Sequence, residues 1–246
     1  MISHKTEELL RKLLAEQPHY KPSAAIIEKL RHINMACFVG ACCMGKTTLM
    51  DALAALDPEY YGKTRNFTSR EPRADDDPKR YYYYPHTDIG LEPVFGRIAS
   101  GENLQHNINP YTLIMYGSEV TDYPHPMNMG DIFSSSIDGF RQLGFGTLWV
   151  FSVVTDPDTW VARVEERFPQ GHPHRESRIR EAIDSLEWSL AQSAADHRWI
   201  YNPAQHLELA ATSVDSVIRG DASISESDAK AMATACLERT KELLVI

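Results

Sequence analysis

The run from Gly40 to Thr48 has the residue types and spacing of a phosphate-binding loop. Its sequence, GACCMGKTT, fits the pattern GxxxxGK[ST]. Such a loop points successive backbone N–H groups into one concavity at the positive end of a helix. Lys46 would add a cation for the β- and γ-phosphates of ATP or GTP, and Thr47 would offer a hydroxyl to Mg²⁺. The residues predicted to bind nucleotide are therefore Gly40, Ala41, Cys42, Cys43, Met44, Gly45, Lys46, Thr47 and Thr48.

The elements on either side of this loop are those that a phosphate site needs. The apolar run 35–39 is typical of a buried strand, and residues 48–56 are typical of a helix that starts inside the loop. Asp57 and Pro58 then end that helix. A chance glycine-rich turn is the alternative, and we disfavour it because strand, loop and helix agree.

A second basic segment could bind another phosphate. Residues 68–73 read TSREPR, and four tyrosines follow at 81–84. The planar fork of Arg70 or Arg73 suits a phosphate or carboxylate dianion. The alternative is a solvated loop with surface ion pairs to the acidic run 75–77. Beside a phosphate loop, we favour two arginines that hold the phosphate of an acceptor.

More arginines flank the polar loop 168–174. Phosphoryl transfer needs positive charge around the migrating group and exclusion of water, which a mobile arginine-bearing lid supplies. The alternative is pairing along helix surfaces, such as Arg163 with Glu166. We favour the lid, whose arginines are Arg163, Arg167, Arg175, Arg178 and Arg180.

The composition limits the classes of partner. The chain has 246 residues and a net charge of −9, which does not favour non-specific binding to nucleic acid. No apolar stretch is long enough to span a bilayer, and the N-terminus leads into an amphipathic helix rather than a signal core. The four cysteines, at 37, 42, 43 and 236, form no CxxC pair, which favours a reducing cytoplasm. His172 and His174 lack partner ligands at useful spacing, so they give little support for a metal site.

The order of the predicted elements indicates an α/β fold with a parallel sheet and helices on both faces. Residues 64–84 are predicted to form short strands and turns. Further strands are expected at 111–117, near 131–133, at 147–154 and at 199–201. Helices are expected at 3–17, 23–32, 93–105, 157–168, 175–196, 204–219 and 226–244.

With these motifs in place, the sequence resembles the guanylate kinase family of nucleoside monophosphate kinases. The loop 40–47 matches the ATP loop of that family, TSREPR resembles its TTRxPR segment, and Tyr116-Gly117-Ser118 resembles its YG[ST] element. Residues 137–140 occupy the place of a hydrophobic–Gln–Gly turn. Arg163, Arg167 and Arg178 match the spacing of the lid arginines, and Asn202 matches a VxN element near the donor adenine. The resemblance covers about residues 35–219.

The resemblance implies a role for each matching residue. Lys46 would bridge the donor phosphates, and Thr47 would hold Mg²⁺. Arg163, Arg167 and Arg178 would close on the transferring phosphate. The residues that would bind the acceptor are Arg70, Arg73, Tyr82, Tyr116 and Ser118, where any of the four adjacent tyrosines could take the place of Tyr82.

Two departures from the family concern the acceptor base. Where the family has a glutamate in a GExxE helix, this sequence has Gln105, or Asn107 when counted back from YGS. Where the family has a DxD pair, it has Ser134 and Ser136. Amides and hydroxyls both donate and accept hydrogen bonds, whereas a carboxylate only accepts, so base specificity is expected to be relaxed or changed. Asp131, Asp138 or Glu119 could replace the missing aspartate near Mg²⁺.

We therefore predict a three-layer P-loop kinase with a small acceptor-binding subdomain at about 64–130 and a lid at about 163–180. These lie in a domain at 33–219, between a helical extension at 1–32 and a C-terminal helix at 220–246. The predicted reaction is ATP-dependent phosphorylation of GMP, dGMP or a related nucleotide by a monomer or homodimer. The alternatives are another small-molecule kinase, such as a ribose bisphosphate kinase, and a non-catalytic guanylate kinase-like binding module. The complete motif at Gly45, Lys46 and Thr47 disfavours the binding module.

Overall fold

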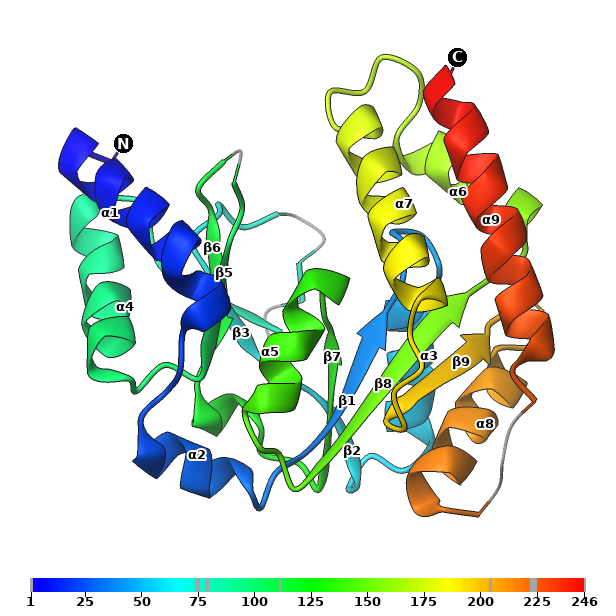
Figure 1. Cartoon of the computed structure of the whole chain (residues 1–246), viewed down its shortest axis with the longest axis horizontal. Helices are drawn as coiled ribbons and strands as arrows, with labels where there is room; N and C mark the ends of the chain where they lie inside the picture. The colour runs from blue at the N-terminus through cyan, green and yellow to red at the C-terminus, as the bar shows by residue number, and fades with distance from the viewer. Residues whose placement is uncertain are drawn as a thin grey trace. The chain divides into compact units, whose positions relative to one another are not determined.

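The structure, a computed structural model, describes residues 2–73, 76–77, 80–110, 112–203, 205–221 and 225–245. Figure 1 shows the course of the chain. The helices are α1 (His4–Glu16), α2 (Ala24–Leu30), α3 (Lys46–Leu56), α4 (Asp88–Ser100), α5 (Ile137–Gln142), α6 (Pro157–Arg167), α7 (Arg175–Leu190), α8 (Leu207–Arg219) and α9 (Ser227–Val245). The strands are β1 (Asn34–Val39), β2 (Tyr61–Lys63), β3 (Asn66–Thr68), β4 (Tyr81–Tyr83), β5 (Gln105–Ile108), β6 (Met115–Ser118), β7 (Met127–Asp131), β8 (Thr147–Val154) and β9 (His197–Tyr201). Short 3₁₀ turns are η1 (Gln17–His19), η2 (Val120–Asp122) and η3 (Ser134–Ser136).

The chain divides into two compact units. Unit 1 comprises Met1–Asn34, Lys63–Asn128 and Gly139–Thr147. Unit 2 comprises Met35–Gly62, Met129–Asp138 and Leu148–Ile246. No helix among the described residues is both long enough and apolar enough to cross a membrane.

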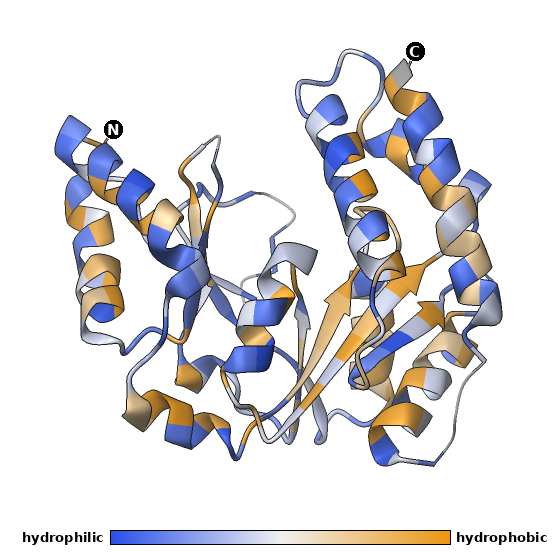
Figure 2. Cartoon of the chain, in the orientation of Figure 1, coloured by the Kyte–Doolittle hydropathy of each residue, from blue (hydrophilic) through white to orange (hydrophobic). Residues whose placement is uncertain are grey.

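A five-stranded parallel sheet in the order β2-β7-β1-β8-β9 forms the framework of unit 2. Strands β1 and β8 are apolar along most of their length, as Figure 2 shows, because side chains on both faces are covered. The helices pack in two groups, α3 against α8, and α7 and α6 against α9. The predicted α/β fold class with a helix-flanked parallel sheet is therefore confirmed.

A four-stranded sheet in the order β4-β3-β6-β5 forms the framework of unit 1. Helices α1 and α4 pack on one face of it, where Leu10, Leu91 and Val94 are fully buried with Phe67 and Met115. Because side chains alternate across a strand, the opposite face carries the remaining strand positions.

Several element boundaries differ from the sequence-based expectation. The helix expected at 93–105 runs from Asp88 to Ser100, because Gly101 adopts a left-handed conformation (φ 71°) that ends it. Residues 105–108 form strand β5 instead. The helix expected at 175–196 stops at Leu190, the strand expected near 131–133 spans Met127–Asp131, and residues 137–140 lie in α5. The strand expected at 111–117 begins at Met115, and Tyr111 lies outside the described residues.

Candidate functional site

The predicted phosphate loop connects β1 to α3 and depends on two glycines. Gly40 has φ 146°, and a Cβ there would lie 2.6 Å from the carbonyl oxygen of Val153. Gly45 has φ 84°, and a Cβ there would lie 2.6 Å from the Asn202 side-chain nitrogen. Larger residues at these positions are therefore both strained and crowded. The loop can take this path only because the motif supplies glycine at both ends.

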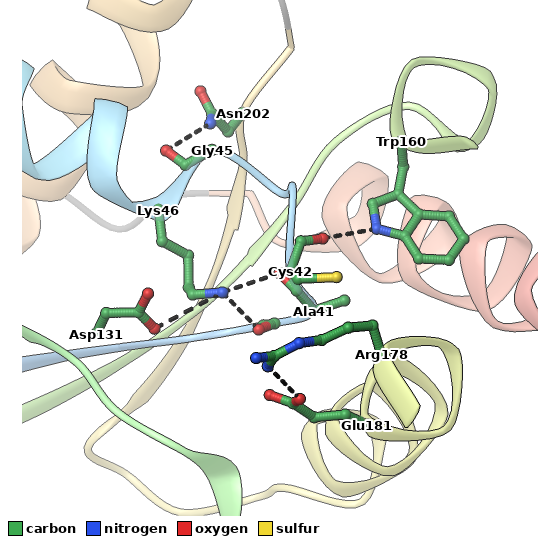
Figure 3. Close-up of polar contacts among 10 residues, drawn as sticks. Ala41, Cys42, Gly45, Lys46, Asp131, Trp160, Arg178, Glu181 and Asn202 are labelled. Carbon is green, nitrogen blue, oxygen red and sulfur yellow. Dashed lines mark hydrogen bonds and ion pairs between the residues drawn. The ribbon is translucent and has the colours of Figure 1, made fainter. Parts of the chain in front are cut away.

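Lys46 is 8% exposed although it carries a charge. Its ammonium group donates hydrogen bonds to the carbonyl oxygens of Gly40 (2.6 Å) and Ala41 (2.8 Å). The carboxylate of Asp131 lies 3.7 Å away, so β7 also contributes to this charge cluster (Figure 3). Backbone oxygens thus hold the cation over the first residues of the loop.

Side chains from α6 and β9 fix the remainder of the loop. The indole N–H of Trp160 donates to the carbonyl of Cys42 at 2.8 Å, and Arg163 donates to the carbonyl of Cys43 at 3.2 Å. Asn202, just after β9, donates to the carbonyl of Met44 at 3.2 Å. Tertiary contacts therefore satisfy three successive loop carbonyls.

The adjacent thiols of Cys42 and Cys43 have opposite electrostatic environments. A hydrogen bond from Cys42, aided by the positive charge of Arg167, lowers the pKa of Cys43 below its usual value. The same hydrogen bond raises the pKa of Cys42, as do burial and the negative charge of Glu181. Cys43 also has a positive φ of 66°. One loop thiol is therefore poised to ionise, and its neighbour is kept protonated.

The predicted lid arginines differ in their partners. Arg163 contacts the loop backbone, and Arg167 interacts with the Cys43 thiol. Arg178 on α7 pairs with Glu181 at 2.7 Å (Figure 3). Arg175 is buried and holds Glu165 and the Phe168 carbonyl, which is a structural role in the α6–α7 connection.

Arg70 in unit 1 is bound to a carboxylate of its own loop. Its two terminal nitrogens donate to the two oxygens of Asp76 at 2.6 and 2.5 Å, in the bidentate geometry that suits planar anions. Tyr83 donates its hydroxyl to Asp76 at 2.7 Å, and the backbone N–H of Arg73 does so at the same distance. The Arg70 guanidinium holds the pKa of Asp76 well below its usual range. Asp75, the other acidic neighbour considered, lies outside the described residues.

Strand register places four predicted or considered residues on one face of the unit 1 sheet. Gln105 pairs with Ser118 and Asn107 pairs with Tyr116 in the antiparallel β5–β6 ladder, so all four lie on one face. The Gln105 amide donates to the Ser118 hydroxyl at 3.3 Å. A face of neutral donors and acceptors results.

Tyr82 does not share that face. It pairs with Phe67, packs with the cluster under α1 and α4, and donates its hydroxyl to Asp122 at 3.1 Å. Tyr83 pairs with Thr68, which in turn pairs with Tyr116. The structure therefore brings Tyr83, rather than Tyr82, beside Arg70.

The other predicted site residues are divided between the units. Ser134 and Ser136 belong to η3 of unit 2 and are half-buried, whereas Gln105 belongs to unit 1. Glu119 is paired with Arg97 at 2.9 Å. Thr47 and Thr48 are exposed on the first turn of α3, and the Arg73 side chain is exposed. Among the carboxylates considered for Mg²⁺ support, Asp131 is placed beside Lys46.

Sequence reasoning missed the roles of Trp160, Asp76 and Tyr83. Trp160 has the spacing of an ordinary core residue, so nothing in the sequence indicates its bond to Cys42. The sequence indicates Asp76 only as an ion-pair partner of Arg70 or Arg73 on the protein surface. A strand-pairing argument for 81–84 could have found Tyr83, because only alternate tyrosines share a face.

Comparison with solved structures supports the fold. The guanylate kinase from Anaplasma phagocytophilum superposes with a TM-score of 0.50 and 13% identity, covering 77% of this chain and 85% of that protein. A gluconokinase from Sinorhizobium meliloti 1021 matches with a TM-score of 0.34 and 14% identity, over 87% of this chain and 97% of that one. No protein-family model matches the sequence, and no curated protein matches it. The first similarity shows that the chain shares the α/β fold of that guanylate kinase.

Proposed function

We propose that this chain transfers the γ-phosphoryl group of ATP to a nucleoside monophosphate, with GMP, dGMP or a related purine nucleotide as the acceptor. The observation that carries the proposal is the position of Lys46, whose buried ammonium lies on the carbonyls of a glycine-dependent phosphate loop. A cation held in this way meets phosphate charge without reorganising, which is the main source of catalysis in phosphoryl transfer.

The donor would bind at the loop of unit 2. Loop N–H groups at the start of α3 would bind phosphate oxygens, and Lys46 would reach the β- and γ-phosphates. The exposed Thr47 hydroxyl and the Asp131 carboxylate are oxygen groups of the kind that Mg²⁺ prefers. Mg²⁺ supplies neutralisation of charge on the β- and γ-oxygens when it is bound.

The acceptor phosphate would bind Arg70. Two oxygens of Asp76 now fill the guanidinium fork, and two phosphate oxygens would fit the same geometry. Tyr83 and Tyr116 would add hydroxyl donors, and Arg73 would add a second guanidinium. Because the fork already binds an internal anion, acceptor binding is proposed to displace Asp76.

Arginines of α6 and α7 would neutralise the transferring group. Arg163 and Arg167 already contact the loop at Cys43, so they need little movement to approach the γ-phosphate. Arg178 is partnered by Glu181, and nucleotide phosphates would compete with that carboxylate. The chemistry is then positioning and charge stabilisation, without a covalent intermediate.

The base of the acceptor would meet neutral groups. Gln105 and Asn107 lie on the same face as Tyr116. An amide can present either its carbonyl or its NH₂, so it rejects the wrong purine less strongly than a carboxylate does.

A coupled assay of ADP release tests the proposal. The purified protein would be given ATP, Mg²⁺ and, in turn, each ribo- and deoxyribonucleoside monophosphate and ribose 1,5-bisphosphate. Turnover that is highest with purine monophosphates would support the proposal. If ribose 1,5-bisphosphate were the only acceptor that is phosphorylated, the acceptor would be a sugar phosphate rather than a nucleoside monophosphate. ATP binding without turnover of any acceptor would favour a binding module.

A further inference from the structure

Unit 1 contains a cavity that the proposed reaction does not use. Its volume is about 800 Å³, and it is lined by residues of α1, of the η1 turn that follows, and of the C-terminal half of α4. Leu9, Leu13, Phe95 and Ile98 supply apolar walls. The volume lies within the range of small-molecule sites, about 300–1,000 Å³.

One polar side chain in this cavity is buried and lacks a well-formed hydrogen bond. His106 on β5 is 8% exposed, and neither of its ring nitrogens has a partner of good hydrogen-bond geometry among the described residues, although the backbone of Leu13 interacts weakly with the ring. The rings of Tyr20 and His106 pack edge to face, with their centroids 4.7 Å apart. The Tyr20 hydroxyl is not available to His106, because it donates to the carbonyl of Asn103 at 2.6 Å. Buried polar groups in folded proteins nearly always have partners, so this histidine indicates a missing ligand atom.

The charge state of His106 defines what that atom can be. Burial lowers the pKa of His106 to about 4, and the backbone of Leu13 offsets only part of the effect. The ring is therefore neutral at pH 7 and offers one N–H donor and one acceptor. A hydroxyl group can pair with either ring nitrogen, and a carbonyl group can accept from the N–H.

The rim of the cavity carries a net positive charge. Lys12, Lys21 and Glu16 all line it, and all are exposed. Lys12 lies 3.8 Å from Glu16, which leaves Lys21 without a counter-charge among the acidic lining residues. An anionic group at the mouth of the cavity would be favoured there, more weakly at high salt.

We propose that the cavity binds an aromatic carboxylate that carries a hydroxyl or carbonyl group on its ring. The ring would lie against Leu13, Phe95 and Ile98, the hydroxyl or carbonyl would pair with His106, and the carboxylate would face Lys12 and Lys21. The site is built from residues of unit 1 alone, so it does not depend on the proposed kinase activity.

Three naphthalene probes test the two polar contacts separately by calorimetry on the full chain. We expect 6-hydroxy-2-naphthoate to bind about tenfold more tightly than 2-naphthoate, which lacks the hydroxyl. We expect it to bind about threefold more tightly than 2-naphthol, which lacks the carboxylate, because exposed charges contribute little.

Variants locate the binding. His106→Phe should abolish the difference between 6-hydroxy-2-naphthoate and 2-naphthoate, and the double variant Lys12→Gln/Lys21→Gln should abolish the difference from 2-naphthol. Ala99→Trp, at an exposed lining position of α4, should fill the cavity and remove all binding. Ala15→Trp is the matched control, because Ala15 is exposed on α1 and does not line the cavity.

The proposal is overturned if no probe binds at millimolar concentration, or if Ala99→Trp binds as tightly as the unmodified protein. It is also overturned if His106→Phe keeps the preference for the hydroxylated probe. If His106→Phe proves unfolded by circular dichroism, the tryptophan pair and the lysine variant still decide the outcome.

Discussion

The two regions of this chain that we propose to bind phosphate hold their cations by different means. In unit 2, Lys46 is fixed by backbone carbonyls of a loop whose shape two glycines determine. In unit 1, Arg70 is fixed by the side chain of Asp76, with tyrosines around it. In the first arrangement neutral carbonyl groups hold the cation, and the carboxylate of Asp131 lies 3.7 Å away. In the second, a carboxylate fills the guanidinium fork, and a ligand would have to displace it.

This difference determines which amino-acid substitutions each region tolerates. The backbone arrangement tolerates few substitutions, because a Cβ at Gly40 or Gly45 collides with neighbouring atoms. The side-chain arrangement can be tuned by a conservative change such as Asp76→Asn, which removes the negative charge and keeps an oxygen that can accept from the backbone N–H of Arg73.

Lys46→Ala should have the largest effect. Removing a charge aimed at the transferring group should lower kcat by about 10³-fold, since such donors act where water is excluded. Steady-state kinetics and thermal unfolding would measure it, with Lys230→Ala on α9 as a control for the loss of a lysine. Turnover near that of the control would remove Lys46 from the mechanism.

Arg70→Ala should reduce kcat/KM for the acceptor by about 10²-fold and leave KM for ATP nearly unchanged. The reason is that Arg70 belongs to the acceptor region, so donor binding does not depend on it. Arg11→Ala, which removes an exposed ion pair to Glu7, is the control. An equal rise in KM for ATP would show that the two regions are not separable in this way.

Cys43 should be the most reactive cysteine in the folded protein. Because the hydrogen bond from Cys42 and the charge of Arg167 lower the pKa of Cys43, alkylation by iodoacetamide should begin to rise at a lower pH for Cys43 than for the other cysteines. Peptide mass spectrometry would follow each cysteine, with buried Cys236, whose pKa burial raises to about 12, as the internal reference. Bound ATP should slow alkylation at Cys43 and also protect activity against mild peroxide. Loss of activity that ATP leaves unaltered would contradict this.

Gln105→Glu should sharpen base selection by about tenfold. A carboxylate accepts hydrogen bonds only, so it would favour the N–H edge of guanine over adenine. Kinetics with GMP, dGMP, AMP, dAMP and IMP would measure the ratio, with Gln142→Glu as an exposed amide-to-acid control. Strict guanine selectivity in the unmodified protein would contradict the premise and direct attention to Glu102, Glu119 or Asp131.

Asp76→Asn should have the smallest effect and the opposite sign. With the internal charge removed, the acceptor phosphate would face a weaker competitor at Arg70, and its KM should fall about threefold. Measuring KM with the preferred acceptor at low and high salt would check this. A rise in KM would mean that Asp76 orients Arg70 rather than competing for it.

Local patterns predicted the strand, the loop and the helix between residues 35 and 56 well, because consecutive residues specify these elements. Strand β8 is also observed over the predicted 147–154 for the same reason, since its apolar run is continuous. By contrast, β5 was missed because its sequence QHNI is polar and its buried residues, His106 and Ile108, are only two. The end of α4 was missed because only the positive φ of Gly101 reveals it.

The acceptor region could not be derived from the sequence, because it depends on strand pairing. Four consecutive tyrosines show no alternation of polar and apolar residues, so the sequence does not reveal which of them share a face. The strand pairing of Tyr82 with Phe67 and of Tyr83 with Thr68 places these two tyrosines on opposite faces. The sequence also leaves open whether Gln105 or Asn107 takes the place of the family's base-reading glutamate. In the structure this choice matters less, because both residues lie on the same face of the sheet.

The alternation along β5 also restricts how this chain can evolve. Gln105 and Asn107 serve one side of the sheet while His106 and Ile108 serve the cavity side and the core. Insertion or deletion of a single residue within the strand would exchange the two sets and damage both sides together. Homologues should therefore differ in length within this strand only in steps of two residues, and a one-residue change should occur only where a bulge restores the frame.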